Sequence, residues 1–76
     1  MDPNYEKIEE AVLALLHLTS FTDQGQTRAW KGHDWDALDR LYQKGYIFDP
    51  KNKNKSVLFT EEGRPCAEQL FQKLFT

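Results

Sequence analysis

The sequence has few of the residues that build disulfide-stabilised, metal-binding or cofactor-binding sites. Of its 76 residues only Cys66 is a cysteine, so no internal disulfide can form and stability must come from packing or self-association. The four glycines are scattered and form no phosphate-cradling loop. The histidines, His17 and His33, lack companions at ligand spacing. We therefore expect no metal, no cofactor and no small-molecule substrate, and a protein that is not an enzyme.

Long hydrophobic runs are also absent. The N-terminus, MDPNYEKIEE, is acidic where a signal peptide would be basic and then apolar, and no apolar run approaches the roughly 20 residues of a membrane span. A single cysteine fits a reducing compartment. The sequence therefore predicts a soluble, cytoplasmic protein with a single domain over residues 1–76.

An excess of positive charge is missing, which argues against a protein built to coat phosphates. The formal net charge is -2. Its distribution is uneven, because residues 1–27 carry -4, residues 28–60 carry +3 and residues 61–76 carry -1. This pattern predicts a local positive face on an acidic body.

Helical spacing predicts a first helix that starts at Asp2-Pro3, with Asp2 as the N-cap and Pro3 in the first turn. Apolar residues recur at helical spacing up to Leu18, and between Ala11 and Leu18 only His17 is polar. A helix that is apolar nearly all round must be covered on more than one side, so we expect a second subunit to cover part of it.

The next segment, residues 20–27, has the composition of a turn, and residues 28–31 predict a short turn or a brief extended segment. A second helix is predicted from Asp34 to Lys44, where Gly45 ends it. Trp30 is expected to fill the core beneath this helix. The other aromatic residues expected in the core are Trp35, Tyr42, Phe59 and Phe71.

A β-hairpin is predicted after the second helix, with strands at residues 46–48 and 56–60 joined by a lysine-rich loop. Pro65 leaves two interpretations of the last helix, because proline lacks the amide that a continuous helix requires there. Either a loose turn at residues 60–63 precedes a regular helix from about Arg64, or one helix has a distorted first turn.

Two segments, LDRLYQKGYI and VLFTEEG, resemble the winged helix-turn-helix superfamily of bacterial regulators. More closely, RAWKG, DWDALDRL and KSVLFTEEG together are similar to a family of small, uncharacterised bacterial proteins, a domain of unknown function. The resemblance implies an α+β, winged-helix-like domain with the order helix, turn, helix, β-hairpin, helix. The segment between Thr27 and His33 departs from the superfamily, because it is too short for a standard second helix.

The lysine-rich loop is the strongest nucleic-acid signal. Lys51, Lys53 and Lys55 alternate with Asn52 and Asn54, so the lysines can follow a phosphate backbone and the asparagines can reach minor-groove acceptors. The same composition also suits a solvated loop that discourages strand association. Residues that would extend a basic face are Arg28, Lys31, Arg40 and Lys44.

Acidic residues at the start of the second helix argue against major-groove contact by that helix. Asp34 and Asp36 occupy the positions that would face base edges, and they are better explained as complements to the helix dipole. Contact with duplex DNA is therefore expected through the loop and not through the helix.

We predict a small non-enzymatic regulator of winged-helix type that contacts nucleic acid weakly through this loop. The alternative is a protein–protein interaction module, an adaptor or an inhibitor of a larger assembly. A homodimer is expected through the first and last helices. The residues assigned to that interface are Leu13, Leu16, His17, Phe71, Leu74 and Phe75.

Overall fold

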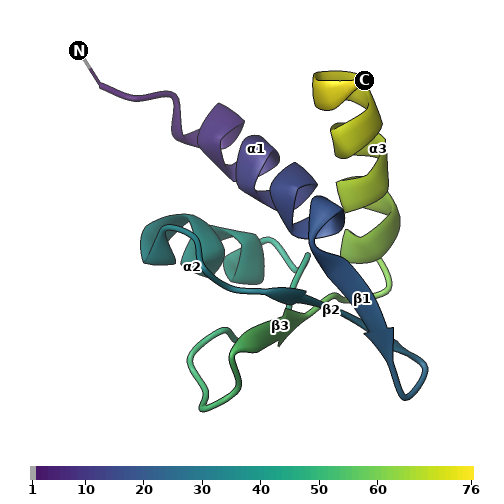
Figure 1. The fold of residues 1–76 in the computed structure, drawn as a ribbon. Coiled ribbons are helices and arrows are strands. Elements are labelled where there is room, and N and C mark those ends of the chain that lie inside the picture. Colours follow the sequence, from purple (N-terminus) through teal and green to yellow (C-terminus); the bar gives the residue numbers. More distant parts are fainter. Residues whose placement is uncertain (1) are drawn as a thin grey trace.

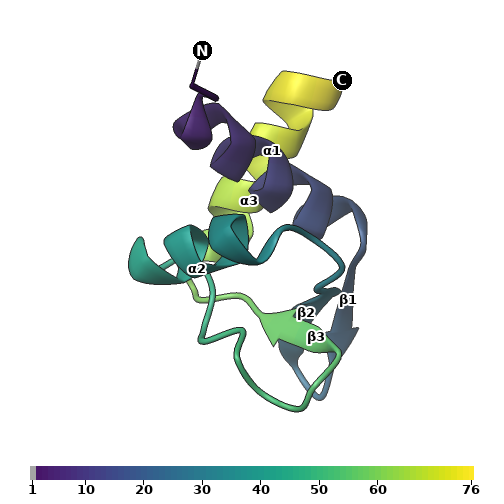
Figure 2. The ribbon, with the colours of Figure 1, turned by 90° about the vertical axis from the view of Figure 1, so that its left-hand side faces the viewer.

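The computed structural model describes residues 2–76 and forms a small α+β domain of three helices and a three-stranded antiparallel sheet. The elements are α1 (Tyr5–Leu18), β1 (Ser20–Asp23), β2 (Gln26–Trp30), α2 (Trp35–Gln43), β3 (Ser56–Leu58) and α3 (Gly63–Phe75). Figures 1 and 2 show α1 and α3 above the sheet and α2 beside them. The expected order, helix, turn, helix, β-hairpin, helix, is therefore wrong: the hairpin precedes α2, and a single strand follows it.

The hairpin β1–β2 occupies the segment for which a turn was expected. Its strands pair from Ser20 opposite Ala29 to Asp23 opposite Gln26. Gln24 and Gly25 form the turn with φ of 52° and 78°, the left-handed conformation that two-residue hairpin turns require. The turn was predicted, and so was a brief extended segment as one alternative for residues 28–31, which overlaps β2; the strand β1 and its pairing with β2 were not predicted. The residues from Thr27 to His33 contain the end of β2 and no helix.

The hairpin expected after α2 is largely replaced by a different pairing. β3 pairs along its length with β2, with Arg28 opposite Leu58 and Ala29 opposite Val57. The segment at residues 46–48 joins the sheet through one isolated bridge, Ile47 opposite Phe59. β2 is therefore the central strand of the sheet, and β3 is an edge strand whose outer side residues 46–48 meet only at that bridge.

The helix ends follow capping chemistry, with one correction. α1 begins after Asn4, whose Oδ1 accepts a hydrogen bond from the Lys7 amide at 3.2 Å, so the predicted start at Asp2-Pro3 lies outside the helix. α2 agrees with its prediction. The Asp34 carboxylate accepts from the Ala37 amide at 3.1 Å, and Gly45 follows the helix with a φ of 83°.

The start of α3 matches the interpretation in which a loose turn precedes the helix. The Thr60 hydroxyl accepts from the Gly63 amide at 2.9 Å, and α3 begins at Gly63. Gly63 also lies against the chain at Tyr46. A Cβ at this glycine would stand 1.7 Å from the Tyr46 carbonyl oxygen, so only glycine allows this close approach.

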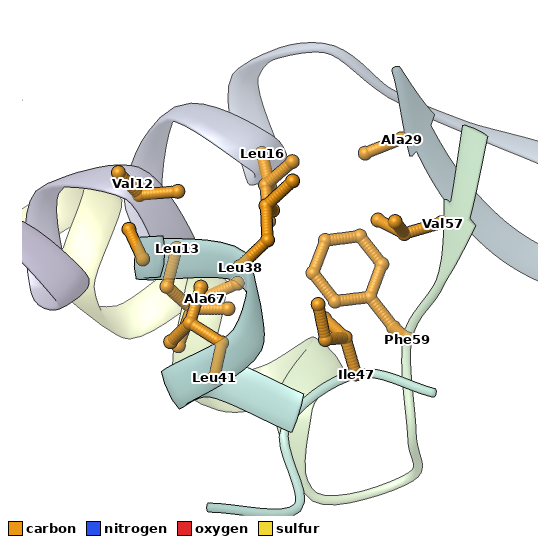
Figure 3. Packing of buried hydrophobic residues seen from close by; sticks show 11 residues of the cluster. Val12, Leu13, Leu16, Ala29, Leu38, Leu41, Ile47, Val57, Phe59 and Ala67 are labelled. Atoms are coloured by element: carbon orange, nitrogen blue, oxygen red, sulfur yellow. The ribbon is translucent and has the colours of Figure 1, made fainter. Parts of the chain in front are cut away.

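The core fills the space between the three helices and one face of the sheet. Figure 3 shows its side chains converging from all these elements. Among the described residues its fully buried members are aliphatic apart from Phe59. The members labelled in Figure 3 are Val12, Leu13, Leu16, Ala29, Leu38, Leu41, Ile47, Val57, Phe59 and Ala67. No helix within residues 2–76 is long and apolar enough to cross a membrane.

Most of the aromatic residues expected in the core lie outside it. Trp30 is 55% exposed and Trp35 is 53% exposed, while Tyr42 is exposed and Phe71 half-buried. Trp30 points away from the helices because its neighbour on β2, Ala29, points toward them and side chains alternate along a strand. Phe59 alone confirms its predicted place in the core.

Candidate nucleic-acid interface

The face of the sheet that points away from the helices carries a row of large side chains. Phe21 lies opposite Arg28, and Arg28 lies opposite Leu58. Phe48 extends the row, because its amide donates to the Leu58 carbonyl at 2.9 Å next to the bridge at Ile47. Phe48 is 53% exposed and the other three are half-buried. Phe48, Leu58, Arg28 and Phe21 are called the open-face row below.

Trp30 stands one step further along β2 on the same face. It lies opposite Ser56, and its ring packs on Phe21 with the centroids 5.1 Å apart and the planes inclined by 33°. Such a tilted, offset contact is favourable between aromatic rings. The exposed remainder of the Trp30 ring forms an aromatic platform together with Phe21.

Arg28 fixes a positive charge in the middle of this surface. Its Nε donates to the Ser56 hydroxyl at 2.8 Å, and its Nη2 donates to the Ser56 carbonyl at 3.2 Å. The side chain is half-buried and lies between Leu58 and Phe21 in register. A guanidinium has five N–H donors, so donors remain after these two bonds.

The lysine-rich loop, residues 49–55, is held in place by Lys31. The Lys31 ammonium donates to the Pro50 carbonyl at 2.7 Å, to the Asn52 carbonyl at 3.2 Å and to Asn52 Oδ1 at 3.1 Å. It also lies 5.7 Å from the centre of the Trp35 ring. The Lys31 ammonium therefore stabilises the loop, and its hydrogen bonds to the loop leave it less available to an outside ligand.

Two turns within the loop add to its order. Asp49 Oδ1 accepts from the Lys51 amide at 2.9 Å, and Asn52 Oδ1 accepts from the Asn54 amide at 2.8 Å. These are the side-chain turns typical of Asp and Asn. Asn52 thus has a structural role, whereas the side chains of Lys51, Lys53 and Lys55 remain exposed, as does Asn54.

The two basic residues predicted on α2 lie apart from the loop, against α1. The Arg40 guanidinium sits 4.5 Å from the centre of the Tyr5 ring, and Lys44 Nζ lies 2.8 Å from Oε1 of the buried Glu9. The hydrogen bond to Glu9 raises the pKa of Lys44. The predicted basic face is therefore divided: Arg28, Lys31 and the loop lie together, and Arg40 and Lys44 join the helices.

The residues predicted for a dimer interface fall into a buried group and an exposed group. Leu13 is 1% exposed and Leu16 is 0% exposed, so both belong to the core of a single chain. The His17 and Phe71 rings pack on each other with centroids 5.3 Å apart, joining α1 to α3. Leu74 and Phe75 are exposed near the C-terminus. Within α1, Leu13 and Leu16 are thus covered within the chain, whereas Ala11 and Leu15 are half-buried and Leu18 is exposed.

Charge is segregated between the two layers of the molecule. The segments of the sheet and its loops, residues 19–33 and 45–60, carry five Lys or Arg against Asp23 and Asp49, a net charge of +3. The helical segments, residues 2–18, 34–44 and 61–76, carry ten acidic residues against five basic ones, a net charge of -5. In both ribbon views the lysine loop lies at the opposite end from the chain termini. The positive layer therefore also holds the exposed rings of Trp30 and Phe48, while other exposed rings lie on the helices at Tyr5, Trp35, Tyr42 and Phe75.

Polar side chains also gather between the helices and before α2. A small cavity of about 170 Å³ is lined by Cys66, Lys44 and three carboxylates, Glu6, Glu9 and Glu10, of which Glu9 pairs with the Lys44 ammonium. Burial lowers the pKa of His33, which stands between β2 and α2. Within residues 2–76 there is no group of three His, Cys, Asp or Glu residues placed to hold a metal ion.

The open-face row was not predicted as a unit, because the hairpin of β1 and β2 was missed, although Arg28 was assigned to a basic face and Phe48 and Leu58 lie in segments predicted as strands. The available signal was alternation in β2, where Arg28 and Trp30 flank the small Ala29. Phe21 falls on the same face once β1 is placed in register with β2. A hairpin assignment for residues 20–30 would have brought these side chains together.

Comparison with known proteins places the chain among small proteins of similar length. Residues 4–76 match the family described as a domain of unknown function, DUF6429. An uncharacterized protein, y4hR, from Sinorhizobium fredii (strain NBRC 101917 / NGR234) is 49% identical over 76 residues, which is 100% of this chain and 99% of that protein. No solved structure matches the chain. These matches agree with the expected likeness to a family of small uncharacterised bacterial proteins, and the chain belongs to the DUF6429 family.

Proposed function

We propose that the protein is a small non-enzymatic binding protein that contacts nucleic acid through the lysine-rich loop. The observation that supports this most is the hydrogen bonding of the loop. The half-buried Lys31 holds the loop backbone, while the side chains of Lys51, Lys53 and Lys55 remain exposed. Lysines on a pre-ordered loop lose less conformational freedom when they bind phosphates than lysines on a free segment do.

The charge distribution supports the same proposal. A net charge of +3 on the sheet side attracts a polyanion, and -5 on the helical side repels it, so the molecule would approach a phosphate backbone with the loop first. Three exposed lysines release few counterions, so the binding is expected to be weak and sensitive to salt.

The proposal uses one part of the resemblance to winged-helix regulators, the wing, and leaves out the recognition helix. α2, the loop and β3 keep the order of a helix followed by a wing and its strand. Asp34 caps α2, and Asp36 lies in its first turn, so the start of this helix is acidic. We therefore assign the contact to the loop and not to α2.

Fluorescence anisotropy with random duplex and single-stranded oligonucleotides at several salt concentrations tests the proposal. Replacing Lys51, Lys53 and Lys55 together with glutamine should weaken binding and reduce the slope of log K against log salt by about 2 on single strands. The matched control, Lys7→Gln with Lys73→Gln on the helical side, should leave the slope nearly unchanged. If neither oligonucleotide binds at low salt, the proposal is wrong, and the alternative of a protein-binding module is favoured.

A second proposal concerns self-association through α1. Ile8, Ala11, Leu15 and Leu18 follow one another at spacings of three and four, and the apolar stripe they form ends at Leu18, which is 60% exposed. This stripe, and not the buried Leu13 and Leu16, is the surface that fits the expected homodimer.

Light scattering at high protein concentration tests the homodimer. The wild-type mass should be that of a dimer, and Ile8→Lys with Leu18→Lys should return the mass of one chain without loss of helical circular dichroism. A wild-type mass of one chain, 8.9 kDa, would contradict self-association.

A further inference from the structure

We infer that the nucleic acid bound by this protein is single-stranded, and that its bases stack on the open face of the sheet at Trp30. This inference rests on the proposed function, because it requires the lysine-rich loop to bind phosphates. It adds the class of ligand and a second surface. The surface consists of the platform formed by Trp30 and Phe21 together with Phe48 at the far end of the open-face row.

The exposure of these rings is the first step of the argument. Fully burying an aromatic side chain is worth about 1.5–3 kcal/mol, yet Trp30 and Phe48 leave more than half of their surface in water. The opposite face of the same strands holds Ala29 and Val57 at 0% and 1% exposure. The helices therefore cover one face only, and the largest side chains of the sheet stand on the other.

The position of the platform beside the loop is the second step. Trp30 lies opposite Ser56, and the Lys31 amide donates to the Lys55 carbonyl at 3.2 Å, so Lys55 follows directly along the same ladder. One step along a strand is about 3.3 Å. The loop therefore ends one residue from the partner of Trp30. Since alternation turns the Lys55 side chain toward the other face at that step, a bound chain would reach the ring and the lysines at the end of the sheet, where the loop joins it.

The chemistry of the surface is the third step. Aromatic platforms next to a positive groove bind single strands with little sequence preference, because every base has a flat face to stack. In a duplex the bases are stacked on each other and are not available to Trp30. Arg28, held between Leu58 and Phe21, supplies a fixed positive charge within the row, which an uncharged or acid-poor peptide would leave unpaired.

Tryptophan fluorescence offers a direct test, since the chain has only two tryptophans. In a Trp35→Phe variant, Trp30 is the single reporter. An oligothymidylate of about 10 nucleotides, a length typical of single-strand sites, should quench or shift its emission, and a duplex of the same length should do so much less. An unchanged emission at concentrations where anisotropy shows binding would overturn the inference.

A matched pair of variants completes the test. Trp30→Ala should weaken oligothymidylate binding by about 10-fold, whereas Tyr42→Ala, which removes an exposed aromatic ring from α2, should leave it unchanged. Thermal unfolding of both variants confirms that they fold.

The outcomes separate this inference from the proposed function. The single-strand inference would be refuted, and the role of the loop kept, by three results together. Duplex and single strand would bind with equal affinity, Trp30→Ala would leave that affinity unchanged, and the lysine variant would lower it. No binding to either oligonucleotide would refute both and leave the open-face row to a protein partner.

Discussion

The two faces of the sheet are built from the same three strands and have opposite compositions. Toward the helices, β2 and β3 present Ala29 and Val57, which are fully buried. Away from the helices they present Arg28, Trp30 and Leu58, which keep part of their surface in water. The small residues let the helices approach closely, while the large ones lie where they add little to the core. The difference indicates that one face serves folding and the other is free to serve binding.

The largest effect is expected when one phenylalanine on each face is replaced by alanine. Phe59 is buried in the core and Phe48 is 53% exposed on the other side. Phe59→Ala should lower the free energy of unfolding by about 3–5 kcal/mol, because it opens a cavity. Phe48→Ala should change it by roughly 0.5 kcal/mol, as is usual for surface positions. Denaturant unfolding measures both, and equal losses would show that the two faces do not differ in this way.

A pair of glycines sharpens the comparison on the buried side. Gly63 lies against the Tyr46 carbonyl, whereas a Cβ at Gly32 would meet no atom within 4 Å. Gly63→Ala should destabilise the protein by about 1–3 kcal/mol, because the backbone must shift to admit the methyl group. Gly32→Ala should be close to neutral. A neutral Gly63→Ala in chemical unfolding would contradict the close approach of α3 to residue 46.

The helical layer and the open face of the sheet also use their cations differently, and the expected changes in stability are smaller than for the two pairs above. Lys44 serves the buried Glu9, and its raised pKa means that its stabilising contribution is complete below pH 10.5 and is lost as pH rises above that value. Lys44→Met should therefore lower stability at neutral pH and flatten its decline in alkali. Arg28→Met on the open face should weaken nucleic-acid binding and, because it removes two hydrogen bonds to the buried Ser56, lower stability by a similar amount at every pH. Unfolding followed against pH, with oligonucleotide titrations alongside, distinguishes the two.

The helices were the part of the fold that the sequence predicted well. α2 has a capping Asp34, a repeating leucine and a terminal Gly45, so local chemistry alone marks both of its ends. α1 was misplaced only at its start, because Asp2-Pro3 and Asn4 both fit a helix cap, and it is the Asn4 side chain that accepts from the Lys7 amide. Signals that act within one turn of chain are readable without knowledge of the fold.

Strand pairing was the part that sequence could not fix. β3 had two candidate partners, the segment at residues 46–48 and the segment at residues 26–30, and the choice depends on long-range register. The error carried Trp30 into the predicted core, since the face on which a side chain lies follows from that register. The lysine loop was predicted as exposed because its composition is local, but the role of Lys31 within it depends on a contact made 19 residues away.

An NMR titration of the protein with an oligothymidylate, followed through the backbone amide chemical shifts, tests the central claim most directly. On titration at low salt, the amides of Phe21, Arg28, Trp30 and Phe48 and of the lysine-rich loop should move together along one binding curve. The amides of α1 and of the second half of α3 should stay in place. Shifts confined to the helices, or to the loop without the open-face row, would contradict the assignment of the outer face of the sheet as a single-strand binding surface.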